Sequence, residues 1–331
     1  MNQSPPANAH SSFNYLVNAL RDPNYRSWIL INPTSIGDTW TVCALAHEFK
    51  KTHGGMLTMV IPDYQTPIAM MYRNSIDRII PVDKAVLSGL CLRSHTLSYF
   101  GIDQPFVAHP FFQGDGRTTS LMNLFALPGR GGVFFADIYR YMLHLDWDTP
   151  LSLPTIPNDW RDEALNYAMS VGIEPGRSVI LFPDNNTAKP LPQEFWQRLV
   201  CALKDEGWKV FTNMAGNSSG PRSLLFDGSY PINLSIKLAI PLAELAGYFI
   251  SGSNGLAALL IGSEAKCKHS WIVANYEDLS EIQKNDPANL YISQQAKYLG
   301  FTKKGLDEYA VNPDRDMGDI IGIIARSKKP L

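Results

Sequence analysis

The chain has 331 residues, of which 45% are hydrophobic and 18% are charged, and its formal net charge is -2 at pH 7. This length exceeds what one hydrophobic core usually organises, and the composition is that of an ordinary globular protein, so we expect two domains. The small net charge argues against general nucleic-acid binding, and no apolar run is long enough to span a membrane.

Two features bear on the compartment. The amino end, residues 1–12, lacks the basic-then-apolar order of a signal peptide. The four cysteines are scattered and form no C-x-x-C pair, so we expect buried free thiols in a reducing compartment. The predicted location is the cytoplasm.

The first half of the chain alternates strand and helix patterns. The apolar run 28–31 is typical of a buried parallel strand, and it is followed by a turn, by a helical pattern that ends at Gly54-Gly55, and by a second strand at 57–61. Further along we expect a helix at 65–72, a strand at 77–82, helical structure around 86–90 and a helix at 133–145. The proline-rich stretch 146–159 is the predicted linker.

The second half repeats this alternation. We expect strands at 178–182, 208–212, 232–236, 248–251 and 271–274, with helices at 159–171, 192–206, 241–247, 256–261 and 314–326. Strands that alternate with helices predict an α/β fold of two doubly wound domains, residues 1–150 and 151–331, which face one cleft. The terminal helix could pack back on the first domain.

The turn at 35–38 is the first candidate site. It lies at the carboxyl end of a strand and the amino end of a helix, where open α/β sheets bind ligands and where anions are favoured. Asp38 has two interpretations, a helix N-cap or a general base that accepts the proton of an alcohol. The turn is not a G-x-G-x-x-G motif, and the chain contains no Walker loop.

Two later turns also follow predicted strands. In the loop 185–189, Thr187 and Lys189 offer a hydroxyl and a positive charge to a phosphate, although a solvated loop is the alternative. In the turn 251–255, the two glycines permit positive φ, and the amino end of a helix at Ser253, Asn254 and Gly255 would bind a phosphate. The alternative there is an ordinary strand-to-helix turn.

Other candidates are weaker. The D-x-D triplets at 146–148 and 314–316 are interpreted as solvated or capping residues. His47-Glu48 lacks the second histidine of a zinc motif. His109 could contact an acceptor, and Tyr139 and Arg140 could face the acceptor side, but packing roles are favoured for the last two.

Taken together, three motifs in order carry a resemblance to a known family. SIGD at 35–38, FPDNNTAKPLPQEFW at 182–196 and PLAELAGYFISGSNG at 241–255 resemble glycosyltransferase family 9, which includes the bacterial lipopolysaccharide heptosyltransferases. The resemblance covers roughly residues 28–275, and the segment 136–154 resembles the one before the interdomain linker of such proteins. It implies the GT-B architecture of two Rossmann-like domains, an N-terminal acceptor side and a C-terminal nucleotide-sugar side.

The resemblance also implies roles for individual residues. Asp38 matches the catalytic base in its turn with Ser35 and Gly37, and Thr187 and Lys189 match the groups that contact the donor diphosphate. Ser253, Asn254 and Gly255 fall where the family has an acidic residue, Ser or Thr, and Gly. The acidic residue is absent here, as is the histidine that follows it, so another nucleotide sugar fits as well as ADP-heptose.

The implied reaction is an inverting transfer to a bacterial surface glycan, lipopolysaccharide-like, without metal or cofactor. Its partners would be a nucleotide-diphosphate sugar and a glycan acceptor, with no nucleic acid and no transmembrane segment, and the protein could be peripheral at the inner membrane. Two alternatives stay open, a catalytically inactive binding or scaffold protein of this fold and a nucleotide-sugar epimerase.

Overall fold

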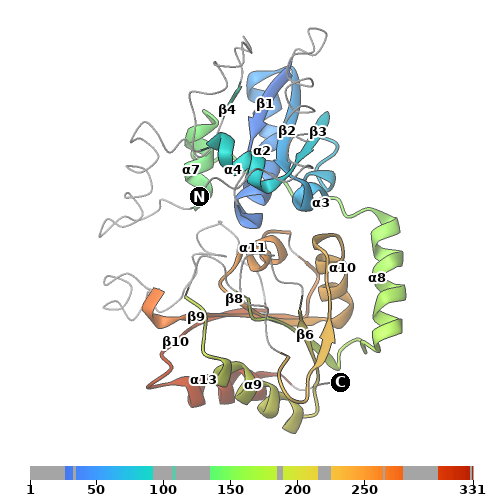
Figure 1. The fold of residues 1–331 in the computed structure, drawn as a ribbon, viewed down its shortest axis with the longest axis vertical. Helices are drawn as coiled ribbons and strands as arrows, with labels where there is room; N and C mark the ends of the chain where they lie inside the picture. Colours follow the sequence, from blue (N-terminus) through green and yellow to red (C-terminus); the bar gives the residue numbers. More distant parts are fainter. Residues whose placement is uncertain are drawn as a thin grey trace, which may run out of the picture. The chain divides into compact units, whose positions relative to one another are not determined.

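The computed structural model of the protein describes residues 27–32, 35–91, 107–108, 135–184, 189–214, 225–263, 265–278, 305–328 and 330. The chain divides into two compact units, Met1–Thr155 and Ile156–Leu331. Each unit contains a parallel β-sheet with helices packed on it, so the protein is a mixed α/β structure (Figure 1). No helix in the described part of the chain has the length and apolarity to cross a membrane.

The sheet of the first unit has the strand order β3-β2-β1-β4, and all its pairs are parallel. Its strands are β1 (Ser27–Ile31), β2 (Met56–Pro62), β3 (Arg78–Val82) and β4 (Val107–Ala108). The chain adds β2 and β3 on one side of β1 and then β4 on the other side. The strand order therefore reverses between β1 and β4, at the carboxyl end of β1.

The helices of this unit are α2 (Ile36–His53), α3 (Thr66–Met70), α4 (Lys84–Cys91) and α7 (Phe135–Met142), and the 3-10 turn η1 (Asp63–Gln65) precedes α3. Helix α2 is buried almost all round, with every residue from 37 to 46 inside, because it packs against β2, α3 and α7. It ends at Gly54, whose N–H bonds to the Lys50 carbonyl at 2.8 Å with φ +69°.

The proline-rich stretch predicted as a linker is held by the first unit over most of its length. The Ser152 N–H donates to the Ala44 carbonyl at 2.8 Å, and the Thr155 N–H donates to the Met71 carbonyl at 2.9 Å. The Tyr72 hydroxyl donates to the Ser152 carbonyl at 3.2 Å. The division between the units falls at the end of this stretch, after Thr155.

The second unit has a six-stranded parallel sheet in the order β10-β9-β8-β5-β6-β7. Its strands are β5 (Ser178–Phe182), β6 (Lys209–Asn213), β7 (Tyr230–Ile232), β8 (Tyr248–Gly252), β9 (His269–Asn275) and β10 (Leu306–Val311). Its helices are α8 (Asn158–Val171), α9 (Gln193–Asp205), α10 (Ile236–Ala246), α11 (Gly255–Gly262) and α13 (Met317–Ser327), with the 3-10 turn η2 (Tyr276–Asp278) after β9. Here the strand order reverses between β5 and β8.

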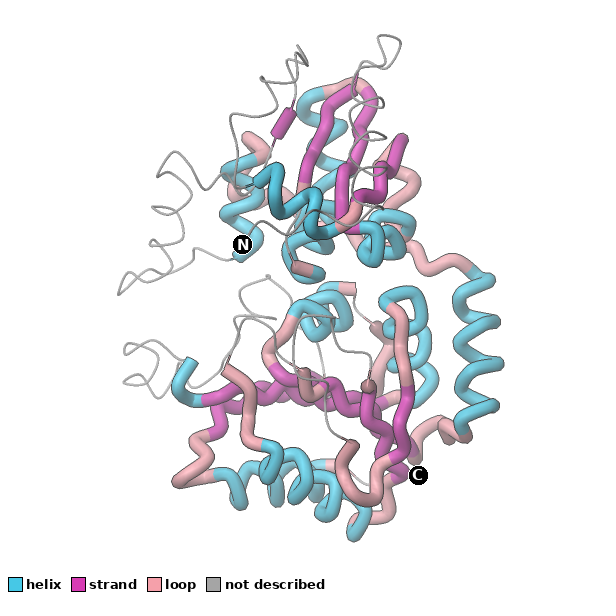
Figure 2. The backbone as a smooth tube through the Cα atoms, in the orientation of Figure 1, coloured by secondary structure: helices cyan, strands magenta, loops and turns pink. Residues whose placement is uncertain are grey.

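Helices cover both faces of this second sheet. Helices α9 and α13 lie on one face and α10 and α11 on the other, as the ribbon and the tube both show (Figures 1 and 2). The strands are consequently buried on both faces, which explains why β5 and β8 read as continuous apolar runs. Within the unit, α13 packs on α9, and its apolar side chains join one core cluster with those of α9, β5 and β6.

Several sequence predictions are wrong in detail. Strand β7 ends at Ile232, whereas a strand was predicted from 232 to 236, and α10 begins five residues before the predicted start with Pro241 inside it. Strand β10 was not predicted at all. Cys201 is exposed, although the cysteines were expected to be buried; Cys43 is buried and Cys267 is half-buried.

Candidate functional site

The predicted site residues that the structure describes lie beyond the carboxyl ends of parallel strands. Ser35, Gly37 and Asp38 follow β1 in the first unit. Lys189 follows β5, and the turn 253–255 follows β8, in the second unit. The other two predicted residues, Thr187 and His109, lie outside the described residues.

Asp38 is the third residue of α2 and belongs to a capping box. Ser35, with extended backbone at φ -76° and ψ 171°, is the N-cap. The Ser35 N–H donates to Asp38 Oδ2 at 3.0 Å, and the Ser35 hydroxyl donates to the same oxygen. The interpretation of Asp38 as the N-cap itself is therefore corrected, because Asp38 is the acidic partner that reaches back to the cap.

Tyr139 of α7 holds the other oxygen of this carboxylate. Its side chain is fully buried, and its hydroxyl donates to Asp38 Oδ1 across a separation of 101 residues. A packing role was predicted for Tyr139, and no local sequence pattern indicates this contact. The next residue, Arg140, anchors the helix, because its guanidinium pairs with Asp137 at 2.6 Å and donates from Nε to the Thr149 carbonyl at 2.8 Å.

The environment of Asp38 changes its acidity. Burial raises the pKa of the Asp38 carboxyl above its ordinary value, and the hydrogen bonds from Ser35 and Tyr139 oppose this effect only in part. A carboxyl group with a raised pKa is better matched to taking up a proton near neutral pH than an exposed one. The two oxygens accept hydrogen bonds from donors on two different elements, Ser35 at the start of α2 and Tyr139 within α7, so the group is held in one orientation.

A buried polar network lies in the same region of the first unit. Asn32 Nδ2 donates to Thr39 Oγ1 at 3.1 Å, and the Thr39 hydroxyl donates to the Gln65 side-chain oxygen. Gln65 Nε2 in turn donates to the Tyr64 hydroxyl at 2.7 Å. Because Asn32, Thr39 and Gln65 are completely buried, the network ties the end of β1 and the first turn of α2 to the segment after β2.

In the second unit, Asn254 connects two of the predicted loops. It is the N-cap of α11, and its Oδ1 accepts from the Ala257 N–H at 2.8 Å. Its Nδ2 donates to the Asp184 carbonyl at 2.7 Å, in the loop after β5. The flanking glycines, Gly252 and Gly255, do not adopt the positive φ that glycine permits.

Lys189 is also tied to a neighbouring strand end. Its exposed ammonium forms an ion pair with Glu277 of η2, directly after β9. Asn275 Nδ2 donates to the Pro190 carbonyl at 3.2 Å and its Oδ1 accepts the Glu277 N–H at 3.0 Å. Contacts of this kind bring Lys189, Asn254 and the ends of β5, β8 and β9 to one edge of the sheet, beside the point where its strand order reverses.

Two acidic residues at this edge were missed by the sequence reasoning. Asp184 lies in the loop that Asn254 holds, and burial raises the pKa of its carboxyl. Glu277 is the partner of Lys189. The sequence lacks an acidic residue at 253, and the structure places these two carboxyl groups on neighbouring loops instead.

The weaker candidates have ordinary surroundings. Asp146 and Asp148 are exposed. Asp316 is the N-cap residue of α13, but its side chain accepts the Asn312 N–H at 2.8 Å and makes no cap hydrogen bond to the helix. His47 is exposed on α2.

Comparisons with known proteins bear on the fold. No protein-family model matches the chain, and no curated protein matches its sequence significantly. Solved structures with similar folds include Escherichia coli ADP-heptose lps heptosyltransferase II, with a TM-score of 0.57 and 11% identity over 91% of this chain and 99% of that one. They also include a family 9 glycosyl transferase from Veillonella parvula, with a TM-score of 0.51 and 17% identity over 75% of this chain and 81% of that one.

A third similar structure is E. coli heptosyltransferase WaaC with ADP, with a TM-score of 0.50 and 13% identity over 90% of this chain and 98% of that one. At these identities the similarity concerns the fold. The chain therefore shares a glycosyltransferase-type fold along nearly its whole length, with a buried, doubly held carboxylate in the first unit and a lysine and a capped helix start at one sheet edge of the second.

Proposed function

We propose that the protein is an inverting, metal-independent glycosyltransferase of GT-B type, with two Rossmann-like doubly wound domains that face one cleft. It would move a sugar from a nucleotide-diphosphate donor to a hydroxyl of a bacterial surface glycan, lipopolysaccharide-like. The observation that carries the proposal is the Asp38 carboxylate, buried at the carboxyl end of β1 and held by Ser35 and Tyr139. The fold similarity to heptosyltransferases supports the choice of reaction.

In the proposed reaction, Asp38 accepts the proton of the acceptor hydroxyl while that oxygen attacks the anomeric carbon of the donor sugar. The new glycosidic bond forms as the bond from the anomeric carbon to the diphosphate oxygen breaks. The nucleoside diphosphate leaves with the electron pair, and the configuration at the anomeric carbon inverts. Tyr139 keeps Asp38 oriented and stabilises its charged form before the proton arrives.

The negative charge on the leaving group would be stabilised in the second unit. Lys189, Thr187 and the amino end of α11 at Asn254 and Gly255 are the proposed donors to the diphosphate. Lys189 would exchange its partner Glu277 for the diphosphate, which costs little because both side chains are more than half exposed and such ion pairs are weak. Closure of the two domains would exclude water, the competing acceptor.

The sugar hydroxyls need hydrogen-bond acceptors, and the family's acidic residue is missing at 253. Asp184, bound by Asn254, and Glu277, bound by Lys189, carry carboxyl groups at this end of the sheet, and we propose that they accept hydrogen bonds from the donor sugar. The fold neighbours named for ADP-heptose motivate testing adenine nucleotides first.

The proposal is tested in two steps. Nucleoside diphosphates are first screened for thermal stabilisation of the protein, because a ligand that binds only the folded state raises its melting temperature. Release of nucleoside diphosphate from the matching nucleotide sugar is then measured with and without glycan acceptors. Asp38→Asn should abolish transfer and retain nucleotide binding.

The matched control is Asp83→Asn, which changes another aspartate of the first unit that caps a helix, through the Ala85 N–H at 2.8 Å. This control should retain both binding and transfer. Transfer by Asp38→Asn at the wild-type rate would refute the proposal. Nucleotide binding with no transfer by the wild type would favour a scaffold protein, and sugar inversion without an acceptor would favour an epimerase.

A further inference from the structure

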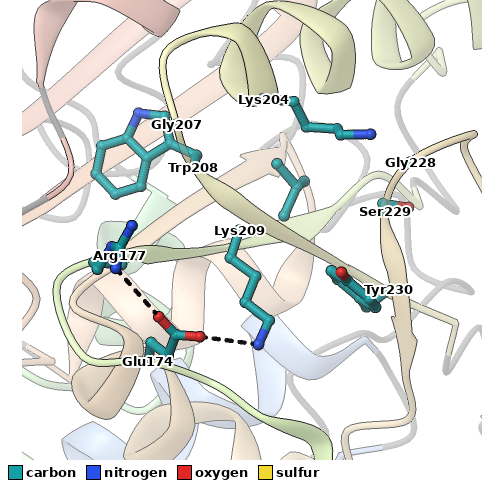
Figure 3. Close-up of a pocket in the computed structure, with 10 residues that line it drawn as sticks. Glu174, Arg177, Lys204, Gly207, Trp208, Lys209, Gly228, Ser229 and Tyr230 are labelled. Atoms are coloured by element: carbon teal, nitrogen blue, oxygen red, sulfur yellow. Dashed lines mark hydrogen bonds and ion pairs between the residues drawn. The ribbon is translucent and has the colours of Figure 1, made fainter.

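A hollow of about 460 Å³ lies at the amino-terminal ends of strands in the second sheet (Figure 3). Arg177 directly precedes β5, Lys209 begins β6 and Tyr230 begins β7, so the hollow is at the amino ends of three neighbouring strands. The candidate site residues of the second unit lie beyond the carboxyl ends of the strands in the same sheet. Since a strand advances about 3.3 Å per residue, the two places are separated by roughly 16 Å, the length of a five-residue strand.

The hollow carries an excess of positive charge. Its lining contains Lys204, Lys209 and Arg177 but only one carboxylate, Glu174. Glu174 is shared, because it lies 3.1 Å from Lys209 Nζ and 3.9 Å from Arg177 Nη1. Within the described part of the chain, the Lys204 ammonium has no hydrogen-bond or ion-pair partner. The hollow therefore holds three cations against one anion.

A glycine leaves room for one of these cations. Lys204 extends from the last turn of α9 over Gly228, so closely that a Cβ atom on Gly228 would lie 2.5 Å from Lys204 Nζ and 2.9 Å from its Cδ. Gly228 has φ +89°, a conformation that favours glycine. A residue with a side chain there would displace Lys204, so the glycine permits the approach of the ammonium.

An aromatic side chain stands beside the charges. Tyr230 lines the hollow and is 52% exposed, so part of its side chain is accessible to a ligand. The Lys209 ammonium lies 5.6 Å from the centre of this ring, and Figure 3 shows the two side chains next to each other in the hollow. The hollow thus offers a flat apolar surface directly next to an ammonium group.

We propose that this hollow is a second binding site, for a small anion that carries a ring, such as a sugar phosphate. Its volume lies within the range of about 300–1,000 Å³ that is typical of small-molecule sites, and a bare phosphate would leave most of it unfilled. The phosphate is attracted by Lys204, Lys209 and Arg177. The ring lies against Tyr230. A neutral sugar would leave the excess charge without a partner.

The test is isothermal titration calorimetry of the full chain with glucose 6-phosphate as the probe, and with glucose and inorganic phosphate as separate arms. We expect saturable binding of glucose 6-phosphate, weaker binding of inorganic phosphate and no binding of glucose. Lys204→Gln should weaken glucose 6-phosphate binding about tenfold, the size expected for losing one charge-assisted hydrogen bond. Lys266→Gln, an exposed lysine of the same unit outside the hollow, should change nothing.

A further variant separates this site from the proposed donor site. Lys189→Gln alters the opposite edge of the sheet and should leave glucose 6-phosphate binding unchanged, whether or not the protein transfers sugars. Three results would each overturn the proposal. These are no saturable binding to the wild type, wild-type affinity in Lys204→Gln, and loss of binding in Lys189→Gln. Equal affinities for inorganic phosphate and glucose 6-phosphate would refute the role of the ring.

Discussion

Replacing Tyr139 with phenylalanine removes one oxygen atom and, with it, the hydrogen bond that the phenol donates to Asp38. Tyr139 is fully buried, so solvent does not readily replace the lost donor. A hydrogen bond to a charged group contributes about 1.5–3 kcal/mol, and one between neutral groups about 0.5–1.5 kcal/mol. The phenol therefore stabilises the charged form of Asp38 over the neutral form by roughly 1 kcal/mol. Without it, the pKa of Asp38, which burial already raises, should rise further.

The measurement is a pH titration of carboxyl carbon resonances in protein labelled at aspartate, with Asp38→Asn used to assign the Asp38 signal. Tyr72→Phe is the matched control, because it removes the same hydroxyl from another buried tyrosine of the first unit, one that donates to the Ser152 carbonyl. Tyr139→Phe should raise the pKa of Asp38, and Tyr72→Phe should leave it unchanged. Identical titrations of the two variants, or a lower pKa of Asp38 in Tyr139→Phe, would refute the role assigned to the Tyr139 hydroxyl.

The Tyr139→Phe variant also tests whether the hydrogen bond from Tyr139 to Asp38 matters for catalysis. If Asp38 is the base, transfer requires its charged form, so the acidic limb of the pH profile of kcat/KM should move to higher pH in Tyr139→Phe. A merely structural role of Tyr139 would lower the rate at every pH without moving this limb. A shifted titration of Asp38 with an unshifted rate profile would show that another group accepts the proton.

Three further predictions concern stability and ligand binding. Asp38→Asn should raise the melting temperature at about pH 7, because a carboxyl with a raised pKa destabilises the fold above its ordinary pKa of 3.8. Scanning calorimetry should show that this gain vanishes below that pH, and a gain that is constant with pH would contradict the prediction. Lys189→Gln should weaken nucleoside diphosphate binding about tenfold, whereas Glu277→Gln, which removes the competing carboxylate, should strengthen it. Equal losses of affinity in the two variants, measured by calorimetry, would refute the exchange of Glu277 for the diphosphate. Asn254→Ala should lower the free energy of unfolding in urea by about 1 kcal/mol, because the α11 cap is lost, whereas Asn254→Asp keeps the cap. Equal losses of stability in the two variants would assign the effect to the hydrogen bond with the Asp184 carbonyl.

The alternation of strands and helices could be predicted from sequence because buried strands and amphipathic helices have local patterns. Strand β10 was not predicted, because its acidic residues suggest a loop. Among the described strands it lies at the edge of its sheet and pairs only with β9, and its Asp307 accepts a hydrogen bond from His269 at 2.9 Å. Helix α10 was predicted to start at Pro241, because proline favours the first turn. The packing of α10 against α8 and the sheet outweighs the hydrogen bond that Pro241 cannot donate.

The candidate site was predictable only where its chemistry is local. Ser35 and Asp38 are three residues apart, and Asn254 caps the helix that directly follows it, so both turns could be located from sequence. Tyr139 and Glu277 could not. They meet Asp38 and Lys189 across 101 and 88 residues, and only the packing of α7 and the order of the strands bring them there.

The negative charge of Asp38 is not needed for the fold that surrounds it. The side-chain oxygen of a neutral amide could equally accept the hydrogen bond from the Ser35 N–H, as in capping boxes that use glutamine. The Tyr139 hydroxyl can donate or accept, so it too would be satisfied by an amide. Burial of the charged form costs free energy, which is why the pKa of Asp38 is raised. A carboxylate whose charge costs stability, at the strand end where open α/β sheets bind ligands, is expected of a group that takes up a proton from a ligand. A protein that served only as a scaffold would gain stability from Asp38→Asn and lose nothing.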